Sequence, residues 1–99
     1  MHVTRIIPES FKAEGAKIIN NQAVEIWLGD VEVNGTLHSK AALRAHVLFE
    51  DTGTEYHQVF KGYDMLSNAS QWLDKHVTSQ WDALWWNMWL SKVYEEACL

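Results

Sequence analysis

Five histidines are the first candidates for chemistry, because imidazole binds metal ions and moves protons near neutral pH. None of them stands in an HxH or HExxH pattern, and the single cysteine provides no paired-thiolate site. On the antiparallel sheet that the middle of the chain predicts, His46 and His57 are diagonal neighbours on the outer face, about 7–8 Å apart. His38 shares that face but lies about 27 Å from His46 along the strand. His46 and His57 could bind one ion or relay a proton, but such histidines are more often polar members of a sheet face. We predict no metal ion and no cofactor.

Nucleophilic catalysis has little support in this sequence. Cys98 is next to the C-terminus, where a chain usually frays and cannot hold a site in place. The serines lack a nucleophile-elbow pattern, and no glycine-rich phosphate loop occurs. We therefore expect no enzyme. The alternative is a small α+β enzyme with a pocket between sheet and helices, using His46, His57 or a buried acid such as Glu25 or Asp30.

The charge balance also restricts the partners. Thirteen acidic residues against eight Lys and Arg give a net charge of −5, and the cations are scattered singly. A surface that binds nucleic acid directly needs clustered cations, so we predict none. An acidic protein can instead dock on a basic surface of another protein. The candidate acidic contacts are Glu50, Asp51 and Glu55, for which ordinary solvated charge is the competing interpretation.

Length and composition predict one domain over residues 1–99. Hydrophobic residues make up 47% of the chain and charged residues 21%, which is typical of a globular protein. No apolar run is long enough for a signal peptide or a membrane span. A single cysteine fits a reducing compartment, so we expect a cytoplasmic protein.

The middle of the chain predicts a β-meander. Asn34-Gly35 is a strong type I′ hairpin signal, and pairing outward from Val33–Thr36 places Ile26 opposite Leu43. Asp30 then falls on the core side, which predicts a bulge near Gly29. A second turn over residues 51–54 would pair Glu50 with Glu55 and Phe49 with Tyr56, although the first of these is a like-charge pair.

The two ends of the chain differ in clarity. Residues 2–7 predict a short strand and Pro8–Glu14 a short helix stopped by Gly15, but the structure of residues 1–22 stays open. Helical periodicity covers residues 65–77, with Asp64 or Ser67 as the cap. Ser79 and Asp82 resemble a capping box for a second helix that ends near Ala97. The predicted fold class is α+β, an antiparallel three- or four-stranded β-meander followed by two C-terminal helices packed on one face.

The last helix is the most unusual element, since five of the six tryptophans lie between Trp72 and Trp89. One apolar stripe is expected to pack on the sheet or the first helix, and it consists of Trp86, Trp89, Leu90, Val93 and Ala97. A second apolar direction needs another cover, and it consists of Trp81, Leu84, Trp85 and Met88. The cover could be the N-terminal segment with Ile6, Ile7, Phe11, Ile18 and Ile19, a second copy of the chain, or a foreign partner. Trp27 shares the outer sheet face with Leu48 and Val59, which could be another contact surface.

These observations favour a small non-catalytic regulator or inhibitor that binds a larger protein complex with a basic surface. Its predicted partner-binding residues are Trp81, Trp85, Met88, Trp27, Glu50, Asp51 and Glu55. In general character, as a short, acidic and tryptophan-rich chain, it is similar to phage-encoded anti-defence inhibitors such as anti-CRISPR proteins. That resemblance implies a nucleic-acid-handling target that is blocked sterically. The alternatives are the small enzyme and a structural homo-oligomer, for instance a homodimer through the last helix.

Overall fold

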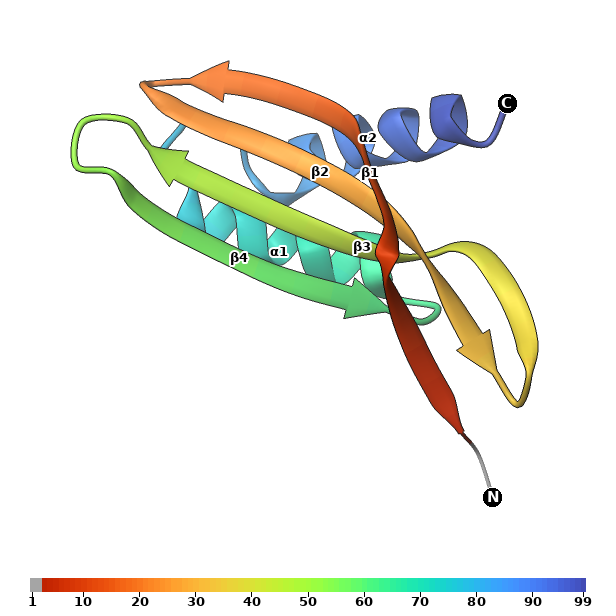
Figure 1. The fold of residues 1–99 in the computed structure, drawn as a ribbon. Coiled ribbons are helices and arrows are strands. Elements are labelled where there is room, and N and C mark those ends of the chain that lie inside the picture. The colour runs from red at the N-terminus through yellow and green to blue at the C-terminus, as the bar shows by residue number, and fades with distance from the viewer. Residues whose placement is uncertain (1–2) are drawn as a thin grey trace.

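The computed structural model describes residues 3–99, which form two layers (Figure 1). One antiparallel sheet has the order β1-β2-β3-β4 and is built from β1 (Thr4–Ile19), β2 (Gln22–Val33), β3 (Thr36–Phe49) and β4 (Thr54–Lys61). Two helices then cover one face of it, α1 (Met65–His76) beneath β3 and β4 and α2 (Ala83–Ala97) beside β1. The predicted α+β meander with two C-terminal helices is confirmed, with four strands. Within residues 3–99 no helix has the length and apolar character needed to cross a membrane.

The β2–β3 hairpin turns at Asn34-Gly35, as predicted. Both residues have positive φ, 50° and 84°, which a two-residue type I′ turn requires. Val33 pairs with Thr36 directly behind the turn. The sequence signal therefore identified both the turn and the register of the hairpin tip.

The predicted irregularity near Gly29 is present and divides the hairpin. Pairing follows the turn as far as Val31–His38 and resumes at Gly29–Ala42, so β3 contributes two extra residues. Lys40 lies in this bulge with a φ of 54°. The strands bend here, and Figure 1 shows the hairpin tip and the start of β1 extending beyond the helix layer.

The bulge makes the predicted register beyond it wrong. Ile26 lies opposite Ala45 and not opposite Leu43. The side chain of Asp30 stabilises the extra residues, because its Oδ1 accepts a hydrogen bond from the Lys40 backbone N–H at 3.1 Å. A shift of two residues leaves the side chains of residues 22–28 and 43–49 on their predicted faces, since side chains alternate with period two. The predicted placement of His38 on the face of His46 is wrong, because His38 lies beyond the bulge and lines a cavity with Met65 and Tyr94 of the helices.

The register of β3 and β4 also differs from the prediction by two residues. Phe49 pairs with Thr54 and not with Tyr56, and the turn occupies residues 50–53. Glu55 then faces Leu48, so the unfavourable Glu50–Glu55 pair does not form. The apolar face again stays toward the core.

The predicted helix over Pro8–Glu14 is wrong, because the N-terminal segment is a long edge strand. Residues 8–11 bulge out between the pairs Ile7–Asp30 and Lys12–Leu28. Ser10 fastens this bulge: its hydroxyl donates to the Ile7 carbonyl at 2.6 Å and accepts from the Asp30 N–H at 2.7 Å. A helix this short is marginal in isolation, whereas the strand gains backbone hydrogen bonds to β2. His2 of the predicted strand lies outside the described residues.

Gly15 serves close packing and does not stop a helix. A Cβ atom at this position would lie 2.8 Å from Cγ2 of Val93 on α2. The glycine therefore allows the helix to approach the edge strand.

The second helix starts later than predicted. Asp82 is its N-cap, with Oδ1 accepting from the Trp85 N–H at 3.1 Å. The Ser79 hydroxyl instead accepts from the Trp81 N–H at 3.0 Å, before the helix begins. The capping box headed by Ser79 is therefore wrong, and Trp81 precedes the helix. Asp64 does occupy the N-cap position of α1, but its side chain makes no capping hydrogen bond.

The connection between the helices is tied to the sheet by a buried glutamine. Gln22 is 2% exposed, donates from Nε2 to the Thr78 carbonyl at 2.8 Å and accepts at Oε1 from the Thr78 N–H at 2.7 Å. At the same end of the sheet, the Glu50 N–H donates to the Asn21 carbonyl at 3.0 Å. This end therefore brings together the β1–β2 turn, the β3–β4 turn and the beginning of the α1–α2 connection.

The core lies between the sheet and the two helices. Its largest fully buried side chains include Trp86, Ile26, Leu43, Leu73 and Leu90. Both helices lie on the same face, so no described element covers the opposite face of the sheet (Figure 1). Two kinds of surface can therefore meet a partner: the outer side of α2 and the open face of the sheet.

Candidate protein-binding surfaces

The first turn and a half of α2 exposes apolar side chains away from the core. The buried side of the helix consists of Trp86, Leu90 and Val93. On the outer side Leu84, Trp85 and Met88 are 67%, 54% and 56% exposed. We call these three residues the α2 patch; they are neighbours because helix positions three and four apart share one face.

Trp81 joins the α2 patch to the core. Its ring centroid lies 6.3 Å from that of Trp85 and 4.8 Å from that of the buried Trp86. The Lys17 ammonium of β1 lies 4.4 Å from the Trp81 centroid, which is a cation–π contact. Trp81 is therefore half-buried and supports Trp85 from one side.

The N-terminal segment does not cover the α2 patch, so that alternative for the surplus apolar surface is wrong. Residues 4–19 are committed to the edge strand. The ring of Phe11 packs over Gly29, and Ile18 is itself 73% exposed. From this strand, Lys17 contacts Trp81 and Trp89, and neither of these belongs to the α2 patch.

The open sheet face has an aromatic and cationic centre. The Arg44 guanidinium lies 4.7 Å from the Trp27 ring centroid and 5.5 Å from that of Phe11. Trp27 is half-buried, and its Nε1 is buried without a hydrogen-bond partner in the described part of the chain. Trp27 is thus partly covered by Arg44 on this face.

The histidines of this face are closer than predicted. His46 and His57 are direct cross-strand partners, with ring centroids 6.1 Å apart in an edge arrangement. His46 also approaches two carboxylates, with Nδ1 3.9 Å from Glu25 Oε1 and Nε2 3.6 Å from Glu55 Oε2. The predicted diagonal placement is wrong because of the register shift. Across residues 3–99 no group of three or more His, Cys, Asp and Glu side chains is arranged to hold a metal ion.

The seven predicted partner-binding residues fall into three places. Trp81, Trp85 and Met88 are together at the start of α2. Trp27 and Glu55 lie on the open face of the sheet, on the other side of the molecule. Glu50 and Asp51 are exposed in the β3–β4 turn. The structure therefore offers separate surfaces and no single one that contains all seven.

Sequence reasoning missed the role of Arg44. Pairing outward from Val33–Thr36 without a bulge would place Arg44 opposite Glu25, but Glu25 faces His46 and Arg44 faces Trp27. The stacking of a guanidinium on two rings depends on the two-residue shift at the bulge. No local sequence signal gives the size of that shift.

No protein-family model matches the chain, and no match was found among the curated proteins or among the solved structures. Function has to be inferred from these surfaces and their chemistry.

Proposed function

We propose that this chain is a small protein-binding regulator that docks on a larger protein through the α2 patch. The observation that supports it is the exposure of Leu84, Trp85 and Met88, each more than half exposed on one side of a helix. Isolated apolar residues on a surface are ordinary, but adjacent ones around a tryptophan are typical of contact surfaces. Tryptophan is enriched among the residues that dominate binding energy, and methionine adapts to irregular partners.

The α2 patch is supported from beneath. Trp85 lies on a capped helix and beside Trp81, which in turn contacts the fully buried Trp86. A side chain held in place loses less conformational entropy on binding than a free one. This preorganisation favours a binding role over incidental exposure.

The proposed partner is basic where it meets the chain. The net charge is −5, and Glu50 and Asp51 are exposed in a turn at the same end of the sheet as the α1–α2 connection, which leads into the α2 patch. The hydrogen bonds of Glu50 to Asn21 and of Thr78 to Gln22 hold this turn and the α1–α2 connection on the same strand turn. Opposite charge around an apolar contact speeds association and fixes orientation. A nucleic-acid-handling complex has such a surface, and occupation of it would block the complex in the manner of phage-encoded anti-defence inhibitors.

A capture experiment tests this proposal. The tagged chain, Trp85→Glu and Leu37→Glu are incubated at low salt with lysate of cells in which the protein naturally occurs. Leu37 is a matched control, since it is 59% exposed at the distant hairpin tip. Glutamate at position 85 suits the third residue after an N-cap, so the helix should tolerate it. Circular dichroism and thermal unfolding check that all three proteins are folded.

We expect one captured protein that the wild type and Leu37→Glu retain, that Trp85→Glu loses, and that is released as salt rises. Solution mass separates the alternatives. A wild-type dimer that Trp85→Glu converts to a monomer would instead support a homo-oligomer through α2. Capture that is equal for all three proteins, or no capture at all, would contradict docking through the α2 patch.

A further inference from the structure

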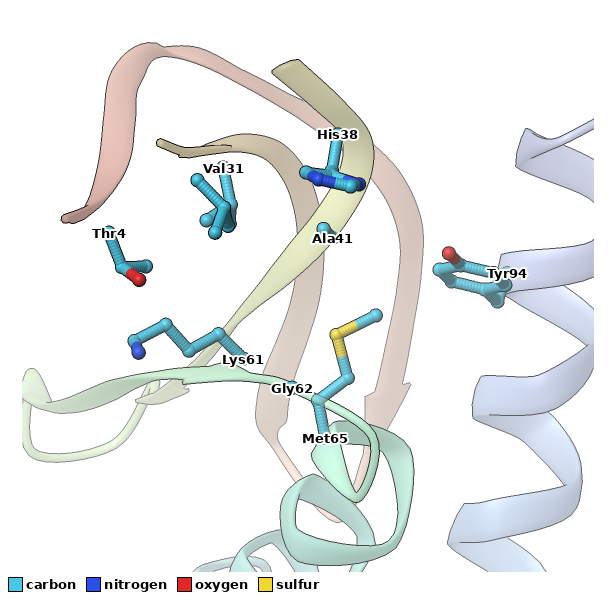
Figure 2. A pocket seen from close by; sticks show the side chains of 9 residues that line it. Thr4, Val31, His38, Ala41, Lys61, Gly62, Met65 and Tyr94 are labelled. Atoms are coloured by element: carbon cyan, nitrogen blue, oxygen red, sulfur yellow. The ribbon is translucent and has the colours of Figure 1, made fainter. Parts of the chain in front are cut away.

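An open cavity of about 470 Å³ lies at the far end of the sheet from the α2 patch (Figure 2). It forms where the hairpin bends away at Lys40 and β4 ends at Lys61, so neither helix fills the space. Its lining comes from all four strands, the start of α1 and the end of α2: Thr4, Val31, Val33, His38, Ala41, Lys61, Gly62, Met65 and Tyr94. The volume is in the range of small-molecule sites.

The inner wall of this cavity is apolar and fixed. Val31 and Met65 are 4% and 6% exposed and belong to the buried part of the chain. Tyr94 closes one side, and its hydroxyl donates to the Lys40 carbonyl at 2.8 Å. The phenol is thus anchored to the bulge, and its ring is held against the cavity. An apolar ligand chain would meet a preformed surface here.

The rim is polar and positively charged. Lys61 runs along it toward Thr4, and the His38 ring lies above Ala41 (Figure 2). None of the nine lining residues is Asp or Glu, although the chain as a whole is acidic. Within residues 3–99 no carboxylate forms an ion pair with Lys61. The ammonium is therefore available to a ligand.

We propose that this cavity binds a small organic carboxylate with an apolar chain. The carboxylate lies at the rim, where it accepts hydrogen bonds from the Lys61 ammonium and from His38. The chain lies against Val31 and Met65. A single lysine matches a singly charged group, and a hydrogen bond between charged partners is stronger than a neutral one. This site is separate from the α2 patch, so the proposal does not depend on the protein-binding role.

Octanoate is a suitable probe, with 1-octanol and octylamine as ligands of the same chain and different charge. Each is titrated into the isotopically labelled full-length chain while methyl signals are followed by NMR. We expect saturable shifts at Val31 and Met65 with a dissociation constant below about 1 mM for octanoate. Octanol should bind at least about tenfold more weakly, and octylamine should cause no shift at these methyls.

Lys61→Gln is the decisive variant, and Lys75→Gln is its control. Both lysines are exposed, so both variants should fold, but Lys75 lies in the last turn of α1 and outside the cavity. Lys61→Gln should weaken octanoate binding at least about tenfold, whereas Lys75→Gln should leave it unchanged. Equal binding of octanoate and octanol, unchanged affinity in Lys61→Gln, shifts confined to other methyls, or no saturable binding would each overturn the proposal.

Discussion

At the level of single residues, the contact between Gly15 and α2 shows why a local sequence signal misleads. Gly15 follows a segment with proline at its start, a pattern typical of a short helix and its stop. In the structure the glycine faces Val93 across a gap that a Cβ would reduce to 2.8 Å. The residue type is explained by a neighbour that lies near the other end of the sequence. The residues next to Gly15 in the sequence do not reveal this contact.

Gly15→Ala should lower the free energy of unfolding by about 1–3 kcal/mol, because the new methyl group overpacks against both Val93 methyls. Val93→Ala makes room for it. The double variant Gly15→Ala/Val93→Ala should therefore be destabilised by less than the sum of the single variants. Denaturant unfolding of the four proteins measures this coupling. Strict additivity would show that β1 and α2 do not meet here.

Tyr94 provides a test at high pH. Desolvation by burial, followed by the charge and hydrogen bond of Cys98, raises the pKa of Tyr94 above its ordinary value of 10.0. The folded chain thus holds this proton more tightly than the unfolded chain. Its contribution to stability is complete below the ordinary pKa and is lost as the pH rises through the raised value.

Ultraviolet absorbance measures tyrosine ionisation directly, because it rises as tyrosine loses its proton. Tyr94→Phe should remove the part of this rise in absorbance that occurs at the highest pH. The chain has three tyrosines, so two remain to report the rest of the titration. The same late rise in the variant would show that another tyrosine is responsible for it.

At the level of elements, the sequence predicted the sheet face of a side chain better than its cross-strand neighbour. The Asn34-Gly35 turn and the alternation of apolar residues specified which side chains of residues 22–28 and 43–49 point to the core, and the structure agrees. The pairs beyond the bulge and beyond the second turn were both displaced by two residues. An even shift preserves the hydrophobic pattern, so the pattern cannot detect it. The sequence therefore could not predict that His46 pairs directly with His57, or that Arg44 lies over the rings of Trp27 and Phe11.

The connection from α1 to α2 should depend on Gln22. Gln22→Met keeps most of the side-chain volume but leaves the Thr78 N–H and carbonyl without the two hydrogen bonds at 2.7 and 2.8 Å. We expect a loss of about 1–2 kcal/mol in the free energy of unfolding. Thr52→Ala, which removes two exposed hydrogen bonds to Thr54 in a turn, is the control and should change it by less than about 0.5 kcal/mol. Equal effects would mean that the buried glutamine does not secure the linker.

At the level of the whole molecule, residues 3–99 cover only one face of the sheet and leave only one of their tryptophans exposed. Trp85 is 54% exposed, whereas the other five tryptophans are half-buried or buried. The sequence indicated a surplus of apolar surface on α2 but left open what would cover it. The answer depends on tertiary structure. The N-terminal segment could have covered this apolar surface, but it forms a strand of the sheet instead.

Acrylamide quenching of tryptophan fluorescence should therefore be dominated by one side chain. Trp85→Phe should lower the quenching constant more than Trp27→Phe does, because Trp27 is half-buried and partly covered by Arg44. The outcome that disagrees is an unchanged quenching constant in Trp85→Phe. Such a result would mean that Trp85 is sheltered in solution, by a second copy or by a different packing.

The most direct measurement is the affinity of the captured partner for wild type, Trp85→Glu and Leu37→Glu, determined by titration calorimetry at one salt concentration. A central tryptophan in an interface typically supplies enough binding energy that its loss weakens affinity by at least about tenfold. We predict that loss for Trp85→Glu and a change below about threefold for Leu37→Glu. Equal affinities of Trp85→Glu and wild type would contradict docking through the start of α2.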